Sequence, residues 1–459
     1  MANIVHRVLG YGMNILKMPG RIKEIHEMTV ESTRSQARRL GRLLDTTQVT
    51  LERVRALDGV TPYDGGPIRV VMLVHYPEAW ASLEPVFRAL EADDAFQATV
   101  ATIPRRFPGA PGFRGEDDTH RELTTRGIPH VRLPFSDSFE SLDVVRALRP
   151  HIVFRQSQWD GDIPPGFSTR ALSFARLCLV PYETMNIVEN VRHSGTPTNT
   201  AVDSPYHRAA WKVFCANDRV RNAALADGTL GGEHFVVTGH PKSLAIVDAA
   251  PSWPIADGAD GRRRRVVWSA HHSIGDDWTR FGLFPAMAGP MIEFAATHPD
   301  VDVVFMPHPM LLTFPGHHQS PIGPEFIDDF LARWSALPNT ATYQGADYAG
   351  ALRASDVLIT DGLSMLVEYQ LLGKPVVFAE RDGHRPFTEI GEVVVRGVHR
   401  HGTVADAIAA AAQLSDGSRD PLADTQAEVI STLFAFDDPD RRIVTALRDG
   451  MLLELDAAR

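Results

Sequence analysis

The sequence has few cysteines, no long apolar run and no excess of positive charge, and each of these absences excludes a class of protein. Its two cysteines, Cys178 and Cys215, exclude a disulfide framework and a cysteine-rich zinc site, and they indicate buried thiols in a reducing compartment. No apolar run approaches the roughly 18–20 residues that span a bilayer, and no signal peptide is evident, so we expect a cytoplasmic protein. The formal net charge of -11 argues against nucleic acid as a partner, because most of the surface would repel phosphates.

The length and composition indicate a globular chain with more than one core. At 459 residues, with 44% hydrophobic and 22% charged residues, the chain is too long for a single ordinary domain. We therefore predict three parts: a helical extension over residues 1–62, an α/β domain over 63–248 and a second α/β domain over 249–459.

The first 62 residues are basic, unlike the acidic remainder of the chain. Apolar residues recur at helical spacing among arginines such as Arg34, Arg38 and Arg42. Three interpretations stay open: helices that form a homo-oligomer, an anchor on the anionic inner face of the plasma membrane, and a helix that packs on the globular part.

From Ile68 onwards apolar strands alternate with helical segments. The strands read IRVVMLVHY, FQATVATI, HIVFRQ, ARLCLVPY, WKVFCAN and HFVVTGHP, and after a linker rich in Pro, Gly and Asp they read RVVWSAHH, VDVVFMPHP, TATYQ, VLIT and VVFAE. Apolar strands separated by helices are typical of parallel sheets that are covered on both faces. We predict two doubly wound, Rossmann-like α/β domains whose strand ends face a shared cleft.

The segment Ser355–Phe378, SDVLITDGLSMLVEYQLLGKPVVF, predicts a strand, a tight turn, an amphipathic helix and a second strand. The turn carries Asp361 and Ser364 at the start of the helix, where backbone N–H groups favour a phosphate. Glu368 lies about one helical turn further on and has the right chemistry to bind a ribose diol. Gly373 is expected to end the helix.

Polar clusters also follow three other predicted strands. They are Gly239-His240-Pro241-Lys242, Ser269-Ala270-His271-His272-Ser273 and Pro307-His308-Pro309. The loops at the carboxyl ends of parallel strands form the ligand crevice of a doubly wound sheet. Together with the turn at Asp361 they predict a pyrophosphate-binding site.

The order of these motifs resembles the CDP-glycerol glycerophosphotransferase family, the teichoic-acid-type polymerases and primases, which have the glycosyltransferase B (GT-B) architecture. VTGHPKS resembles the family's G-x-P-R/K turn, FMPHPM resembles its K-x-HP motif without the lysine, and DVLITDGLSMLVEYQLLGKPVVF is similar to its D-x-LITDYSS segment and the LxKP strand that follows. FDDPDRRIVTAL is similar to the family's acidic segment ahead of an R-I pair. The resemblance covers most of residues 68–450.

This resemblance implies a transferase that moves a glycerol-phosphate or related alditol-phosphate group from a CDP-activated donor to a hydroxyl of a cell-surface glycan or lipid-linked precursor, with release of CMP. It implies no cofactor and no metal. The donor-binding residues that it implies are Gly239, Lys242, His271, His308, Asp361, Ser364, Glu368 and Arg381, with His308 and Ser364 on the pyrophosphate, Lys242 or Arg381 adding charge, and Glu368 on the ribose.

The catalytic base is where the chain departs from the family pattern. The family's W-H-G-T motif has no counterpart here, and the comparable region reads LVPYETMN. The candidate catalytic residues are Glu183, His272 and His308, with Tyr182, His75 and Asp160 as further candidates for the base. Glu183 suits this role if burial raises its pKa.

Three other functions stay open on the sequence. A GT-B glycosyltransferase would use the same nucleotide site. A UDP-sugar 2-epimerase is the second alternative, because RDGHRPF (Arg381–Phe387) is similar to the R-x-x-T-E-R-P turn of those enzymes. A non-catalytic nucleotide-binding scaffold is the third, since the family's usual base is missing.

Overall fold

The computed structural model divides the chain into two compact units, Met1–Asp58 and Gly59–Arg459. It describes residues 60–106, 112–189, 199–257, 261–276, 279–313, 315–317, 320–343, 345, 347–434, 436–457 and 459, together with Gln36 and Thr47. The predictions for the helical extension, its oligomer contacts and its membrane contact therefore lie outside the described residues. Within the described residues, no helix combines the length and the apolar character that crossing a membrane requires.

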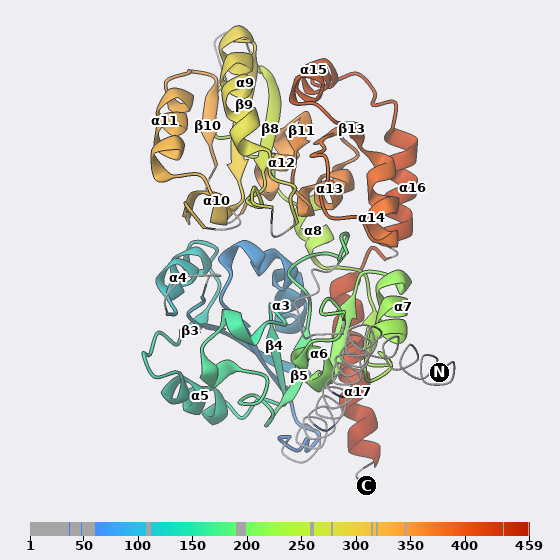
Figure 1. Ribbon diagram of the computed structural model, residues 1–459. Helices are drawn as coiled ribbons and strands as arrows, with labels where there is room; N and C mark the ends of the chain where they lie inside the picture. Colours follow the sequence, from blue (N-terminus) through green and yellow to red (C-terminus); the bar gives the residue numbers. More distant parts are fainter. Residues whose placement is uncertain are drawn as a thin grey trace, which may run out of the picture. The chain divides into compact units, whose positions relative to one another are not determined.

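The first domain is built on a seven-stranded parallel sheet (Figure 1). In spatial order its strands are β3 (His130–Arg132), β2 (Phe96–Thr102), β1 (Ile68–Val74), β4 (Ile152–Arg155), β5 (Arg176–Leu179), β6 (Lys212–Cys215) and β7 (Phe235–Val237). The connecting elements are η1 (Pro77–Ser82), α3 (Glu84–Glu91), α4 (Glu116–Thr125), α5 (Ser138–Ala147), η2 (Asp160–Asp162), η3 (Pro165–Phe167), α6 (Pro205–Ala209), α7 (Asp218–Asp227) and α8 (Lys242–Val247).

The second domain is built on a six-stranded parallel sheet. Its spatial order is β10 (Thr340–Thr342), β9 (Val301–Pro307), β8 (Arg264–Ala270), β11 (Val357–Thr360), β12 (Val376–Ala379) and β13 (His399–His401). Its helices are α9 (Phe284–Thr297), α10 (Pro309–Thr313), α11 (Pro324–Ser335), α12 (Ala349–Ala354), α13 (Ser364–Glu368), η4 (Tyr369–Leu372), α14 (Glu389–Val394), η5 (Val395–Gly397), α15 (Val404–Leu414) and α16 (Ala423–Leu433). The two doubly wound sheets confirm the predicted fold class. The boundary at residue 249 stays a prediction within the connection between α8 and β8.

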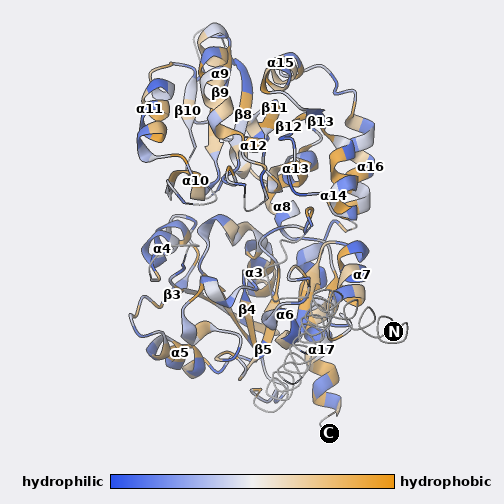
Figure 2. Cartoon of the chain, viewed as in Figure 1, coloured by the Kyte–Doolittle hydropathy of each residue, from blue (hydrophilic) through white to orange (hydrophobic). Residues whose placement is uncertain are grey.

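Apolar side chains from the strands form a core on each face of each sheet. Val71 and Leu73 of β1 belong to one core, while Val70 and Met72 belong to the core on the opposite face. This alternation follows from the pleat, which turns successive side chains to opposite faces. In Figure 2 helices such as α15 and α16 show both hydrophilic and hydrophobic residues, as expected for helices that cover a sheet.

The last helix, α17 (Pro439–Ala457), follows the second sheet in the sequence but packs on the first. Its buried residues Ile443 and Leu447 join the core that contains Val70 and Met72. The range 249–459 predicted for the second domain therefore includes a helix whose core contacts lie in the first domain.

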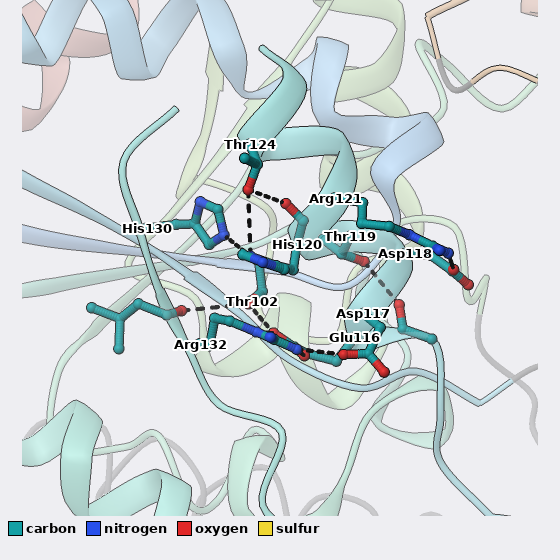
Figure 3. A network of polar contacts seen from close by, with 12 residues as sticks. Thr102, Glu116, Asp117, Asp118, Thr119, His120, Arg121, Thr124, His130 and Arg132 are labelled. Carbon is teal, nitrogen blue, oxygen red and sulfur yellow. Dashed lines mark hydrogen bonds and ion pairs between the residues drawn. The ribbon is translucent and has the colours of Figure 1, made fainter. Parts of the chain in front are cut away.

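A polar network fixes α4 over one edge of the first sheet (Figure 3). The buried carboxylate of Glu116 accepts hydrogen bonds from the Thr102 hydroxyl and from the Arg132 guanidinium, which also pairs with Asp117. His120 and His130 contact each other on the same edge, with 2.8 Å between the facing ring nitrogens. These contacts hold α4 to β2 and β3.

The helix predicted after Asp361 is shorter than expected. α13 has five residues and tightens into the 3-10 turn η4. Gly373 ends the turn with φ of 62°, the left-handed conformation that glycine adopts at low cost. Strand, turn and Gly373 lie where the sequence predicts them, but the dipole of so short a helix is small.

Candidate functional site

Three of the four predicted polar clusters meet at the carboxyl edge of the second sheet. β8 lies between β9 and β11, so the loops after these three strands are neighbours. The direction of the strand order changes at β8, and ligands of doubly wound sheets bind at such a point. The loops carry His271, His272, His308 and Asp361.

The histidines form one cluster. The ring centroids of His272 and His308 are 4.1 Å apart, those of His271 and His272 are 4.6 Å apart, and those of His271 and His308 are 5.7 Å apart. Burial lowers the pKa of His271 well below its usual range, with a further contribution from His272. Burial lowers the pKa of His308 to about 3, with contributions from His271 and from Arg105 of the first domain. His271 and His308 are therefore neutral at pH 7 in the free protein.

Hydrogen bonds fix the tautomers of these two rings. The backbone N–H of Ser273 donates to Nδ1 of His271 over 3.2 Å, and that of Met310 donates to Nδ1 of His308 over 3.2 Å. Because each Nδ1 accepts, the proton of each neutral ring sits on Nε2. The cluster can therefore present N–H donors to phosphate oxygens without carrying a charge.

Asp361 holds the loop after β8 in place. Its Oδ1 accepts the backbone N–H of His271 over 2.7 Å, and its Oδ2 accepts that of Leu283. Burial raises the pKa of Asp361 to about 7. The Arg381 guanidinium supports the same loop, because it donates to the carbonyl of Ile274 over 2.7 Å and pairs with Asp276. Both predicted donor-binding residues thus contact the protein itself, next to the histidine cluster.

A small, partly open cavity lies beside this edge. Its volume is about 40 Å³, and it is lined by Glu183, Thr184, Met185, Asn186, Ile187, Val188, Leu363, Ser364 and Val367. Glu183 of the first domain and Ser364 of the second domain thus line the same cavity, and Ser364 is exposed. Burial raises the pKa of Glu183, although the charge of Lys242 opposes that rise. A carboxylate with a raised pKa has the chemistry of a general base.

Lys242 and Glu368 form a buried ion pair. The Lys242 Nζ lies 3.0 Å from Glu368 Oε1 and donates to the carbonyl of Tyr182 over 2.6 Å, while the Tyr348 hydroxyl donates to Glu368 Oε2 over 2.5 Å. Glu368 is 0% exposed. Both predicted donor-binding side chains are thus paired with each other across the two domains.

Gly239 stands near the same junction, with φ of 80°. A Cβ at this position would lie 3.2 Å from Pro439 and 3.3 Å from the carbonyl of Phe436, so the glycine admits the segment that leads into α17.

The remaining candidates for the base lie in the first domain. His75 is fully buried, and neither of its ring nitrogens has a hydrogen-bond partner among the described residues. Burial, followed by the charges of Arg155 and Arg105, lowers the pKa of His75 well below its usual range. Asp160 pairs with Arg155 over 2.6 Å, and burial raises the pKa of Tyr182. None of these three side chains lines the cavity.

Sequence reasoning missed several residues that support the site. The Gln156 amide oxygen accepts the backbone N–H groups of His75 and Tyr76, over 2.8 and 2.9 Å. Tyr348 supplies the second contact of Glu368, and the segment after Glu183 supplies one wall of the cavity. The signal in the sequence was the apolar Met185, Ile187 and Val188 directly after the segment LVPYE.

Among the described residues, no group of three or more His, Cys, Asp and Glu side chains is arranged to hold a metal ion.

Comparisons with known proteins identify the type of fold. No protein-family model matches the sequence, and no curated protein matches it either. Solved structures do match. A protein described as a candidate UDP-N-acetylglucosamine 2-epimerase of Listeria monocytogenes has a TM-score of 0.57 at 17% identity, over 84% of this chain and 96% of that one. The fold is of the GT-B type.

Two further structures of this type were solved with ligands. MnaA of S. aureus, in complex with UDP, has a TM-score of 0.55 at 16% identity over 84% of this chain and 97% of that one. The UDP-GlcNAc 2-epimerase of Neisseria meningitidis, bound to UDP-GlcNAc, has a TM-score of 0.55 at 15% identity over 83% of this chain and 100% of that one. At such identities the likeness establishes the fold, and the chemistry has to be argued from the site.

Proposed function

We propose that this chain is a transferase that binds a nucleoside-diphosphate-activated donor at the carboxyl edge of the second sheet and moves the activated group to an acceptor hydroxyl. The observation that carries this proposal is the cavity that Glu183 of the first domain and Ser364 of the second domain line together. A group with the chemistry of a base thus lines a cavity that the turn after β11 borders, and this turn belongs to the sheet edge that also carries the histidines. A transfer reaction needs such a group close to both substrates.

The proposed roles follow from these positions. The Nε2–H groups of His271 and His308 would donate to the oxygens of the donor pyrophosphate, and the Ser364 hydroxyl would add a further donor. Negative charge develops on the leaving phosphate during transfer, and fixed donors around it stabilise the transition state. Glu183 would accept the proton of the acceptor hydroxyl while the hydroxyl oxygen forms a bond to the activated group of the donor. The bond between that group and the nucleotide breaks, and the nucleotide leaves with the electron pair of that bond.

A CDP-activated alditol phosphate is the donor that the motif resemblance favours, with CMP as the product and a cell-surface glycan or a lipid-linked precursor as the acceptor. Similar folds were solved with UDP and UDP-GlcNAc, which favours a UDP-sugar as the donor. A transferase with such a donor would be a GT-B glycosyltransferase. Both donors contain a pyrophosphate diester, so the proposed hydrogen bonds from the histidines and from Ser364 could be made to either of them.

A UDP-sugar 2-epimerase is the second candidate. The observation in its favour is the GT-B likeness to proteins named as UDP-GlcNAc 2-epimerases, together with the turn at Arg381–Phe387. An epimerase needs no acceptor, so turnover of a free UDP-sugar without any acceptor separates it from a transferase.

A thermal-shift panel of CMP, CDP, CDP-glycerol, UDP and UDP-GlcNAc tests the proposal. A ligand that binds only the folded protein stabilises it by about 2.7 kcal/mol at a hundredfold excess over Kd. We expect stabilisation by cytidine or uridine diphosphates. Product analysis of the stabilising donor, with and without acceptor glycans, then separates transfer from epimerisation. Binding without turnover on any acceptor would instead indicate a scaffold, and a silent panel would refute the proposal.

A further inference from the structure

The first domain contributes more than Glu183 to the cavity. Residues Glu183–Glu189, called the strap here, leave the first sheet after β5 and contact the second domain. Six strap residues, from Glu183 to Val188, line the cavity opposite Leu363, Ser364 and Val367. The cavity therefore has one wall from each domain.

Backbone hydrogen bonds hold the strap on the loop before α14. The Thr388 N–H donates to the carbonyl of Ile187 over 3.0 Å, and the Glu189 N–H donates to the carbonyl of Pro386 over 2.9 Å. Between these bonds Val188 forms an antiparallel bridge with Phe387. The Thr388 hydroxyl donates to the carbonyl of Asn186 over 3.0 Å. The strap thus pairs with the second domain as a short strand would.

Apolar packing holds the strap as well. Met185, Ile187 and Val188 are each less than 9% exposed and belong to the second-domain core that contains Leu366 and Phe387. Removing the strap would expose these side chains to water, which is unfavourable. The strap therefore packs as part of the second domain, although in the sequence it follows strand β5 of the first sheet.

Gly391 is the residue that admits the strap. A Cβ at this position would lie 2.0 Å from the carbonyl oxygen of Ile187 and 2.9 Å from Cβ of Phe387. Since the nearest atom belongs to the backbone, an alanine here forces the strap or α14 to shift. Only glycine fits this contact without movement.

We propose that the docked strap is a fixed wall of the donor site, so that the nucleotide-activated donor binds only when first-domain residues 183–189 are seated against Gly391. This inference rests on the proposed function and deepens it, because residues of both domains then form the donor site. Gly391 acts through the strap and is a positioning residue.

The test compares Gly391→Ala with Gly289→Ala. Gly289 lies on α9 of the same domain, and a Cβ there would meet nothing within 4 Å. Titration calorimetry with CDP, UDP, CDP-glycerol and UDP-GlcNAc measures affinity, and hydrogen exchange of Ile187–Glu189 reports whether the strap is seated. We expect Gly391→Ala to raise strap exchange and to weaken nucleotide binding at least tenfold, while Gly289→Ala changes neither. Faster strap exchange with unchanged affinity would overturn the inference.

If Gly391→Ala does not fold, a disulfide between the strap and the second domain provides a second test. Val188 and Phe387 face each other in an antiparallel bridge, where paired side chains lie close enough for a disulfide. In Val188→Cys/Phe387→Cys, a fixed wall predicts equal nucleotide affinity in the oxidised and reduced forms. Loss of binding on oxidation would show that the strap has to move, against the proposal. If the wild type binds no nucleotide while its strap amides stay protected, the proposed function itself fails and the composite donor site fails with it.

Discussion

At the scale of single residues, the position of a residue in the sequence predicted some contacts of the site and not others. His271, His272 and His308 follow apolar strands, and neighbouring parallel strands bring such positions together, so their cluster could be predicted. The contacts of Glu368 could not. Its partners Lys242 and Tyr348 lie 126 and 20 residues away in the sequence, and nothing local in the chain records either contact.

Glu183 carries the sharpest prediction at this scale. Glu183→Gln should lower kcat by about 10²- to 10⁴-fold, the usual contribution of a general base, while donor affinity stays within a factor of a few. Because the base acts when deprotonated and burial raises its pKa, the wild-type rate should rise with pH through that raised pKa. The measurement is a pH profile of nucleotide release.

Glu140→Gln is the matched control for this prediction, since Glu140 is exposed on α5 and does not line the cavity. An unchanged kcat in Glu183→Gln would remove Glu183 from the mechanism.

At the scale of elements, apolar runs decided what could be predicted. The central strands have buried side chains on both faces, so their sequences stand out as apolar segments. The edge strands β3 and β13 were missed, because HVR and HRH are three residues long and largely polar. The placement of α17 was missed for another reason: its apolar stripe fits any sheet, and only the folded chain shows that it covers the first one.

Leu447 tests the placement of α17. Leu447→Ala removes a side chain from a core shared with Val70 and Met72 and should destabilise the protein by about 2–5 kcal/mol. Hydrogen exchange should rise in β1 before it rises in β8. Leu453→Ala is the control on the same helix, because Leu453 is 71% exposed and should change stability little. Equal effects of the two variants would contradict the packing.

At the scale of the whole molecule, the two domains meet through contacts that also border the candidate site. The strap, the Lys242–Glu368 pair and the contact of Gly239 with the segment before α17 all join parts that are far apart in the sequence. The fold class followed from alternating strands and helices. These junctions did not, since each joins segments that are far apart in the sequence, and no local pattern records such a contact.

The measurement that tests the account most directly is titration of CDP-glycerol and UDP-GlcNAc into the wild type and into His308→Gln. Both ligands are pyrophosphate diesters, whose phosphate oxygens can accept the Nε2–H of His308. Because the pKa of the free ring is about 3, His308 should act as a neutral donor between pH 6 and 8. We predict saturable binding of one of the two donors that weakens at least tenfold in His308→Gln. No binding of either donor, or binding that His308→Gln leaves unchanged, would contradict a donor site at this edge of the second sheet.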